Sequence, residues 1–127
     1  MDIPKTIKQF NNLLHSFLVQ ISPLIGSNYL SYYKKFIKIN SIAPINFFIE
    51  NIYIHKNKIL NKDEKYFNDE DDVLKHYTND QFKLNEIFKL RGLYNKIDNE
   101  SKNNTWTYLH ALIGLTEEYM IQKNLIN

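Results

Sequence analysis

The sequence predicts an all-α fold, a compact bundle of five or six helices in a single domain that spans residues 1–127. Apolar residues recur at spacings of three and four along most of the chain, which is the period of an amphipathic helix. Only one run resembles a strand, and it has no second run to pair with. A chain of 127 residues also buries roughly two-thirds of the surface that it exposes when unfolded, so one core is sufficient.

The N-terminal half carries three predicted helices. The first covers residues 5–21, with Pro4 in its first turn, and we expect Pro23 and Gly26 to end it. The second covers residues 28–40, with Ser27 as its cap. The third covers residues 44–60, although the β-branched residues between 49 and 54 are also compatible with a strand.

The remaining helices are predicted from shorter patterns. Residues 62–67 form one helical turn that anchors Phe67, and an acidic link leads into a helix over residues 70–77. Thr78 and Gln81 have capping-box spacing at the start of a helix over residues 80–95. A polar connector then leads to the C-terminal helix.

The C-terminal helix, residues 105–122, has the broadest apolar face in the chain, and Asn103 or Asn104 caps it. One edge of this face is formed by Trp106, Leu109, Ile113 and Met120. We expect it to be buried against the first and third helices. Gly114 lowers helix propensity by about 1 kcal/mol relative to Ala, which indicates that another backbone passes close to it.

Composition limits the environment of the protein and the chemistry of its partners. Ile, Asn, Lys, Tyr and Phe supply 66 of 127 residues, which indicates an A/T-rich genome. The chain has no Cys, no secretory signal pattern and no run of the roughly 20 apolar residues that span a membrane, so we expect an intracellular, reducing location. The net charge of +2 is uneven: residues 1–60 carry +5 and residues 61–100 carry −3, so the N-terminal half is the better candidate for an anionic partner.

No pattern in the sequence is typical of catalysis. The acidic run over residues 69–72 lacks the alternating ligands, the Gly and the terminal Glu of a calcium loop. His15, His55, His76 and His110 have no metal-ligand spacing, and there is no phosphate loop or nucleophile motif. We therefore predict that the protein is not an enzyme and that it has no catalytic residue, no metal and no cofactor or small-molecule substrate.

One segment has the composition of a nucleic-acid contact. Tyr and Phe alternate there with Lys34, Lys35 and Lys38, which are suited to phosphate contacts and base stacking. The same spacing also describes an ordinary amphipathic helix with a solvated basic face. Since the chain contains a single Arg, direct base readout is not indicated.

A resemblance adds a hint about origin. Residues 58–67, followed by Thr105-Trp106-Thr107-Tyr108-Leu109, resemble a pattern in small helical proteins of nucleocytoplasmic large DNA viruses. The resemblance covers the C-terminal two-thirds of the chain and implies a viral protein of unassigned biochemistry, a component of the virion or of the infected-cell cytoplasm. It transfers no catalytic residue.

The functional prediction is a non-enzymatic structural or adaptor protein that binds a protein partner or a second copy of itself. Aromatic residues make up 14% of the chain, and Tyr is favoured at interfaces because it is both apolar and hydrogen-bonding. The expected interface residues, at helix margins, are Tyr29, Tyr32, Tyr53 and Tyr66. The alternative is a nucleic-acid-associated protein that uses the basic helix face of Lys34, Lys35 and Lys38.

Overall fold

The computed structural model describes residues 2–26, 28–68, 77–90 and 92–126. Its α-helices are α1 (Ile3–Ile25), α2 (Asn28–Ile39), α3 (Ala43–Asn51), α4 (Lys56–Leu60), α5 (Asn79–Lys89) and α6 (Asn99–Gln122). The described residues contain no strand, which confirms the predicted all-α class. The predicted helix over residues 70–77 lies outside the described residues except for Tyr77.

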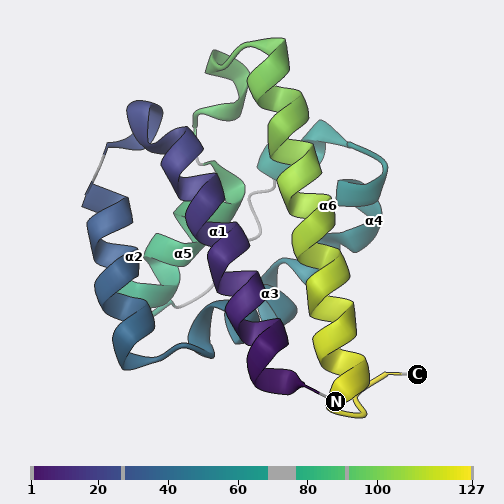
Figure 1. The fold of residues 1–127 in the computed structure, drawn as a ribbon. Helices are drawn as coiled ribbons and strands as arrows, with labels where there is room; N and C mark the ends of the chain where they lie inside the picture. The colour runs from purple at the N-terminus through teal and green to yellow at the C-terminus, as the bar shows by residue number, and fades with distance from the viewer. Residues whose placement is uncertain (1, 27, 69–76, 91, 127) are drawn as a thin grey trace.

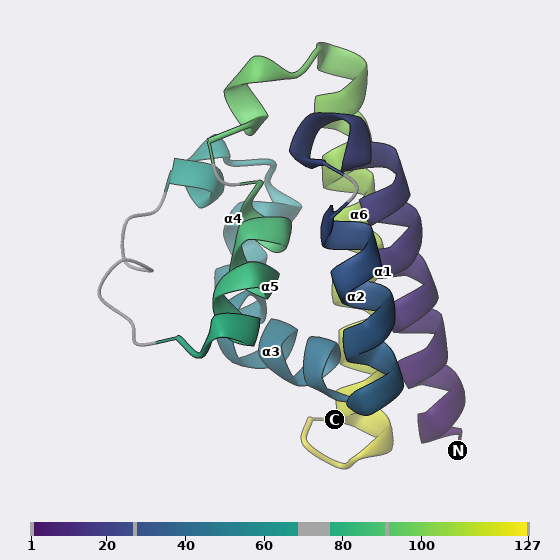
Figure 2. The ribbon, with the colours of Figure 1, turned by 90° about the vertical axis from the view of Figure 1, so that its left-hand side faces the viewer.

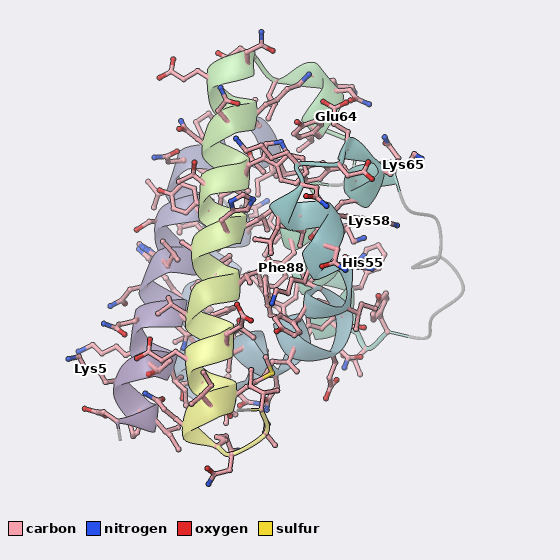
Figure 3. All side chains as sticks on the ribbon, turned by 90° about the vertical axis from the view of Figure 1, so that its right-hand side faces the viewer. Lys5, His55, Lys58, Glu64, Lys65 and Phe88 are labelled. Carbon is pink, nitrogen blue, oxygen red and sulfur yellow. The ribbon has the colours of Figure 1, made fainter. Side chains whose placement is uncertain are left out.

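The helices form two layers. In Figure 1, α1 lies between α2 and α6, and the view turned by 90° in Figure 2 shows α3, α4 and α5 in the second layer behind these three helices. The fully buried ring of Phe88 on α5, labelled in Figure 3, packs against the rings of Phe47 and Phe48 on α3, and the ring of Phe48 in turn packs against that of Phe10 on α1. The core therefore sits between the layers, with aromatic rings from both.

The long helices α1 and α6 run antiparallel along each other (Figure 1). The hydroxyl of Thr6 near the start of α1 donates to Oε1 of Gln122 at the end of α6, over 2.9 Å. Further along the pair, the ring centroids of Phe17 and Tyr108 are 5.3 Å apart. α6 also contacts α3 and α4, so its predicted packing against the first and third helical segments is confirmed.

The first helix is longer than predicted because Pro23 does not end it. Pro23 lies inside α1, where it has no N–H to donate to the carbonyl of the preceding turn. The hydroxyl of Ser22 donates to that carbonyl, the oxygen of Val19, over 2.9 Å. The helix therefore continues to Ile25 and ends at Gly26, which has a φ of 94°.

The predicted helix over residues 44–60 is interrupted, so the prediction of one continuous helix is wrong. α3 ends at Asn51, a 3₁₀ turn covers Tyr53–His55, and α4 then begins. The β-branched Ile52 and Ile54 have weak helix preference at this point. The break allows both Ile52 and Ile59 to be fully buried.

The boundaries of α5 and α6 also differ from the prediction. The capping box of Thr78 and Gln81 is confirmed at the start of α5, but the helix ends at Lys89 instead of residue 95. Leu90 adopts a left-handed conformation with a φ of 45°, and its side chain is buried. α6 begins at Asn99 instead of residue 105, and the carboxylate of Asp98 accepts from the N–H of Ser101. The first turns of this helix are polar, so they have no apolar period from which the sequence could predict them.

Trp106 lies in an aromatic cluster that the helical pattern did not indicate. Its Nε1 donates to the hydroxyl of Tyr94 over 3.0 Å, and its ring centroid lies 5.0 Å from that of Phe67. The ring of Phe67 in turn stacks on Tyr94 at 4.1 Å. The direct aromatic contacts of Trp106 therefore come from the predicted turn over residues 62–67 and from the end of the predicted helix over residues 80–95, and the predicted turn that anchors Phe67 is confirmed.

The expectation that a backbone passes close to Gly114 is wrong. Gly114 is exposed, and a Cβ added there would have no atom within 4 Å. The residue therefore lowers helix propensity without any packing reason.

We predict that Trp106→Ala lowers the free energy of unfolding by about 3–5 kcal/mol, because a buried aromatic leaves a cavity when it is removed. Urea denaturation followed by circular dichroism measures this change. Thr107→Ala, at the exposed neighbouring position, should stay within about 0.5 kcal/mol of wild type. Equal stability of the two variants would contradict the burial of Trp106.

We predict that Gly114→Ala raises the free energy of unfolding by about 0.5–1 kcal/mol, since Ala restricts the unfolded chain and meets no steric obstacle here. The reverse change at the exposed position Ala111, Ala111→Gly, should lower stability by a similar amount. Thermal and urea unfolding check both variants. Destabilisation by Gly114→Ala would mean that the helix is not regular at this residue.

Candidate functional site

The surface between α2 and α5 combines polar contacts with hollows. The hydroxyl of Tyr29 on α2 donates to a carboxylate oxygen of Glu86 on α5, and the hydroxyl of Tyr32 donates to Asp80. Nζ of Lys83 lies 4.1 Å from the ring centroid of Tyr32. The two helices are thus joined by side chains that reach across the gap.

Local sequence explains why these groups meet. On α2, Tyr29, Tyr32 and Phe36 follow each other at spacings of three and four, so they share one face of the helix. On α5, the capping box starts the helix at residue 79, and Asp80, Lys83 and Glu86 then recur at a spacing of three. Each row therefore faces the other along its length.

Three hollows follow this boundary from the start of α2 to its end, and we call them together the seam groove. The first has a volume of about 320 Å³ and is lined by Leu24, Tyr29, Glu86 and Leu93 among others. The second, about 230 Å³, is lined by Asn28, Tyr29, Tyr32 and Lys83. The third, about 310 Å³, includes Phe36, Asn46, Phe47, Glu50, Asp80 and Leu84 in its lining. Tyr29 is shared by the first two hollows, and Tyr32 reaches from the second to Asp80 in the third.

The groove is acidic overall. Among its described lining residues are the carboxylates of Glu50, Asp80 and Glu86 and one ammonium group, that of Lys83. The hydrogen bond to Glu86, together with burial, raises the pKa of Tyr29 from 10.0 to about 12. Burial, followed by the hydrogen bond to Asp80, also raises the pKa of Tyr32. Both phenols therefore stay protonated and act as hydrogen-bond donors to carboxylates.

The opposite, solvent-facing side of α2 is basic, and we call it the lysine ridge. It consists of Lys34, Lys35 and Lys38 with the adjoining Ile39. All four are exposed, and the side chain of Ile39 is 85% accessible, the largest value among the exposed large apolar residues of the described chain. Within the part of the chain that the structure describes, none of the three lysines forms an ion pair.

The basic character extends over α1. Between Ile3 and Ile49 the sequence has five Lys and no Asp or Glu. All five lysines are exposed, and Figure 3 shows Lys5 pointing into solvent from the first turn of α1. The lysine ridge is therefore part of a wider cationic side of the molecule.

The four tyrosines predicted as interface residues do not come together. Tyr29 and Tyr32 lie in the seam groove, where both are half-buried. Tyr53 lies on the other side of the second layer, where its hydroxyl donates over 3.0 Å to a Glu117 oxygen that also accepts from Lys56. The prediction that Tyr66 lies at the surface is wrong: it is fully buried, because its hydroxyl donates to the carbonyl of Phe88 inside the core.

The residues that the sequence prediction missed are the carboxylates of the groove. Asp80 and Glu86 were not singled out, although their spacing with Lys83 on a capped helix was a usable signal. Glu50, exposed at the end of α3, had no distinguishing pattern. Sequence periodicity predicts what one helix presents, and it does not indicate which helix lies opposite.

The histidines and acids of the described chain do not form a metal site. Within residues 2–26, 28–68, 77–90 and 92–126 there is no group of three His, Asp or Glu side chains that could hold an ion. Nε2 of His110 lies 2.8 Å from the carbonyl oxygen of Ile59 and thereby ties α4 to α6. The acidic run over residues 69–72 and His76 lie outside the described residues.

We predict that the free energy of unfolding falls as the pH rises from 10 to about 12, and that this fall is shallower in Tyr29→Phe. A phenol whose pKa is raised on folding stabilises the fold fully below its unfolded pKa of 10.0, and this contribution is lost toward the folded value of about 12. Denaturant titrations at several pH values measure the slope. Tyr108→Phe is the matched control, since no described group accepts from that hydroxyl; equal slopes in both variants would contradict the Tyr29 contact.

Comparisons with protein-family models, with curated proteins and with solved structures gave no match to this chain. Among the helices of the described ranges, none combines the length and the hydropathy needed to cross a membrane.

Proposed function

We propose that the protein acts by binding other proteins, as a structural or adaptor component without catalysis, and that the seam groove is its binding surface. The observation that carries this proposal is the row of three hollows along α5, which α1 and α2 line at one end and the end of α2 and α3 line at the other, next to the 85% exposed Ile39. Interfaces combine aromatic and apolar contact area with a polar rim. Phe36, Phe47 and Leu84 supply such apolar walls in the third hollow.

The hydrogen bonding of the tyrosines supports the same proposal. The hydroxyls of Tyr29 and Tyr32 are already held by carboxylates, so their rings are fixed in the groove walls before a partner arrives. A rigid aromatic wall loses little conformational entropy on binding. The virion role implied by the viral resemblance is part of this proposal and rests on that resemblance alone.

The second candidate function is nucleic-acid binding through the lysine ridge. It is favoured by the five exposed lysines between residues 3 and 49 and by the absence of carboxylates there. Against it, the ring of Tyr32 already contacts Phe36 and Lys83, and the nearby groove presents carboxylates that repel phosphate. The exposed Ile39 also has no use in phosphate contacts. We therefore place protein binding first.

We predict that Asn46→Trp abolishes partner binding without unfolding the protein, because Asn46 is exposed on α3 and a larger side chain there fills the third hollow. Tagged wild type and variant are used to capture proteins from an extract of the source cells, with quantitative mass spectrometry. Captured partners should fall at least about tenfold with the variant, as expected when a group blocks the centre of an interface.

Asn103→Trp is the matched control, since Asn103 is exposed on α6 away from the groove lining. It should capture the same proteins as wild type. Equal capture by Asn46→Trp and Asn103→Trp would exclude the third hollow as the binding surface. Recovery of nucleic acid alone, with an affinity that falls steeply as salt rises, would replace protein binding by the second candidate.

A further inference from the structure

We propose that the occupant of the third hollow is a second copy of this chain: the lysine ridge of one copy covers the third hollow of its partner, and the partner's ridge covers the first copy's hollow. The inference rests on the proposed function, because it names the partner of the same groove. It is supported by the lysine ridge and the third hollow, which are complementary in charge and in apolar groups.

The first feature is charge. The described lining of the third hollow includes the carboxylates of Glu50 and Asp80 and no Lys or Arg. Glu50 is exposed and makes no ion pair among the described residues, whereas Asp80 accepts from Tyr32 and keeps oxygen lone pairs free. The ridge presents three unpaired ammonium groups. A single chain thus carries both signs of charge without pairing them internally.

The second feature is an apolar anchor that matches an apolar wall. Ile39 lies one helical turn beyond Lys35 and is almost fully exposed. The third hollow has Phe36, Phe47 and Leu84 in its walls and a volume of about 310 Å³, which is enough to accept a side chain. Phe47 and Leu84 are already buried in the core, whereas Phe36 is half-buried. Insertion of Ile39 beside Phe36 would remove apolar surface of both copies from water.

The third feature is the placement of ridge and hollow on the same helix. Phe36 lines the hollow, while its neighbours Lys35 and Lys38 lie on the solvent side of α2. Figure 2 shows α2 facing the viewer with α5 beside it, the two helices that supply the ridge and part of the hollow. A two-fold axis beside α2 then brings each ridge to the other hollow, which is the self-complementary arrangement of a closed dimer.

Within the described chain, Lys34, Lys35 and Lys38 form no ion pair with Glu50 or Asp80. Tyr32 and Phe36 occupy the face that turns toward α5, and Lys34 and Lys38 lie one turn apart on another face. The charges of the ridge are therefore left for a contact between molecules. Phosphate, by contrast, would meet the carboxylates of Glu50 and Asp80 at the edge of the same patch.

The test reverses the charge of the ridge in one variant and of the hollow in another, and measures self-association by sedimentation equilibrium at low ionic strength. Wild type should dimerise, and the association should weaken as salt rises. The double variant Lys35→Glu with Lys38→Glu, and separately Glu50→Lys, should each weaken self-association about 100-fold or more, because like charges then meet across the interface. Asp80 is left unchanged, since it holds Tyr32.

An equimolar mixture of the two variants should recover the dimer as a heterodimer, because the reversed ridge of one then meets the reversed hollow of the other. Misfolding cannot produce this recovery. The control Lys65→Glu with Lys96→Glu changes the same charge at exposed positions elsewhere and should dimerise like wild type; Figure 3 shows Lys65 at the outer edge of the second layer. Ile39→Ser should weaken the dimer without changing its salt dependence.

A monomeric wild type at all accessible concentrations would overturn the inference, as would a mixture that stays monomeric. If wild type is monomeric but Asn46→Trp still abolishes capture of a different protein, the proposed function stands and the second copy is wrong. If the mixture recovers the dimer and Asn46→Trp captures everything that wild type does, the dimer stands and the groove is not an adaptor surface for other proteins.

Discussion

The antiparallel packing of α1 against α6 is the constraint on which the rest of the structure depends. These are the two longest helices of the described chain, of 23 and 24 residues, and most of the stability of a helix in a protein comes from the packing of its apolar face. Fully buried residues such as Leu14, Leu18 and Leu109 each contribute about 1.5–3 kcal/mol when they leave water. α6 also contacts the segment that contains α4: His110 hydrogen-bonds to the carbonyl of Ile59, and Glu117 accepts from Lys56.

α2 is attached to the bundle in a different way. Tyr33 is its one fully buried residue, and the hydroxyl of Tyr33 donates to the backbone carbonyl of Asn11 on α1. Toward α5 the helix is held by tyrosine hydroxyls and carboxylates instead of interdigitated apolar side chains. A hydrogen bond contributes about 0.5–1.5 kcal/mol but fills little space, so contacts of this kind fix the distance between two helices without closing the gap. The seam groove is the consequence.

Sequence periodicity was sufficient to predict that the helices exist. It was not sufficient to predict where they end or which side chains they contact on other helices. The apolar period predicted the long helices, and the Thr78 capping box predicted the start of α5. The left-handed Leu90 that ends α5 carries no signal, because burial of its side chain depends on contacts made elsewhere in the fold. The same limit applies at the candidate site: the sequence placed Tyr29 at a helix margin, where it is half-buried, but its acceptor Glu86 lies 57 residues away. Tyr66 has the same local pattern but packs inward.

The composition of the chain includes many lysines, but composition alone does not explain where they lie. Mutational bias toward Lys codons would scatter Lys and its carboxylate neighbours along every exposed helix, as on α5, where Asp80, Lys83 and Glu86 alternate. On α1 and α2 the carboxylates are missing altogether. Unscreened positive charge costs electrostatic energy in the folded monomer, because the lysines repel each other with nothing to offset the repulsion. The partner that we propose would offset this cost beside the exposed Ile39, because it would supply negative charge.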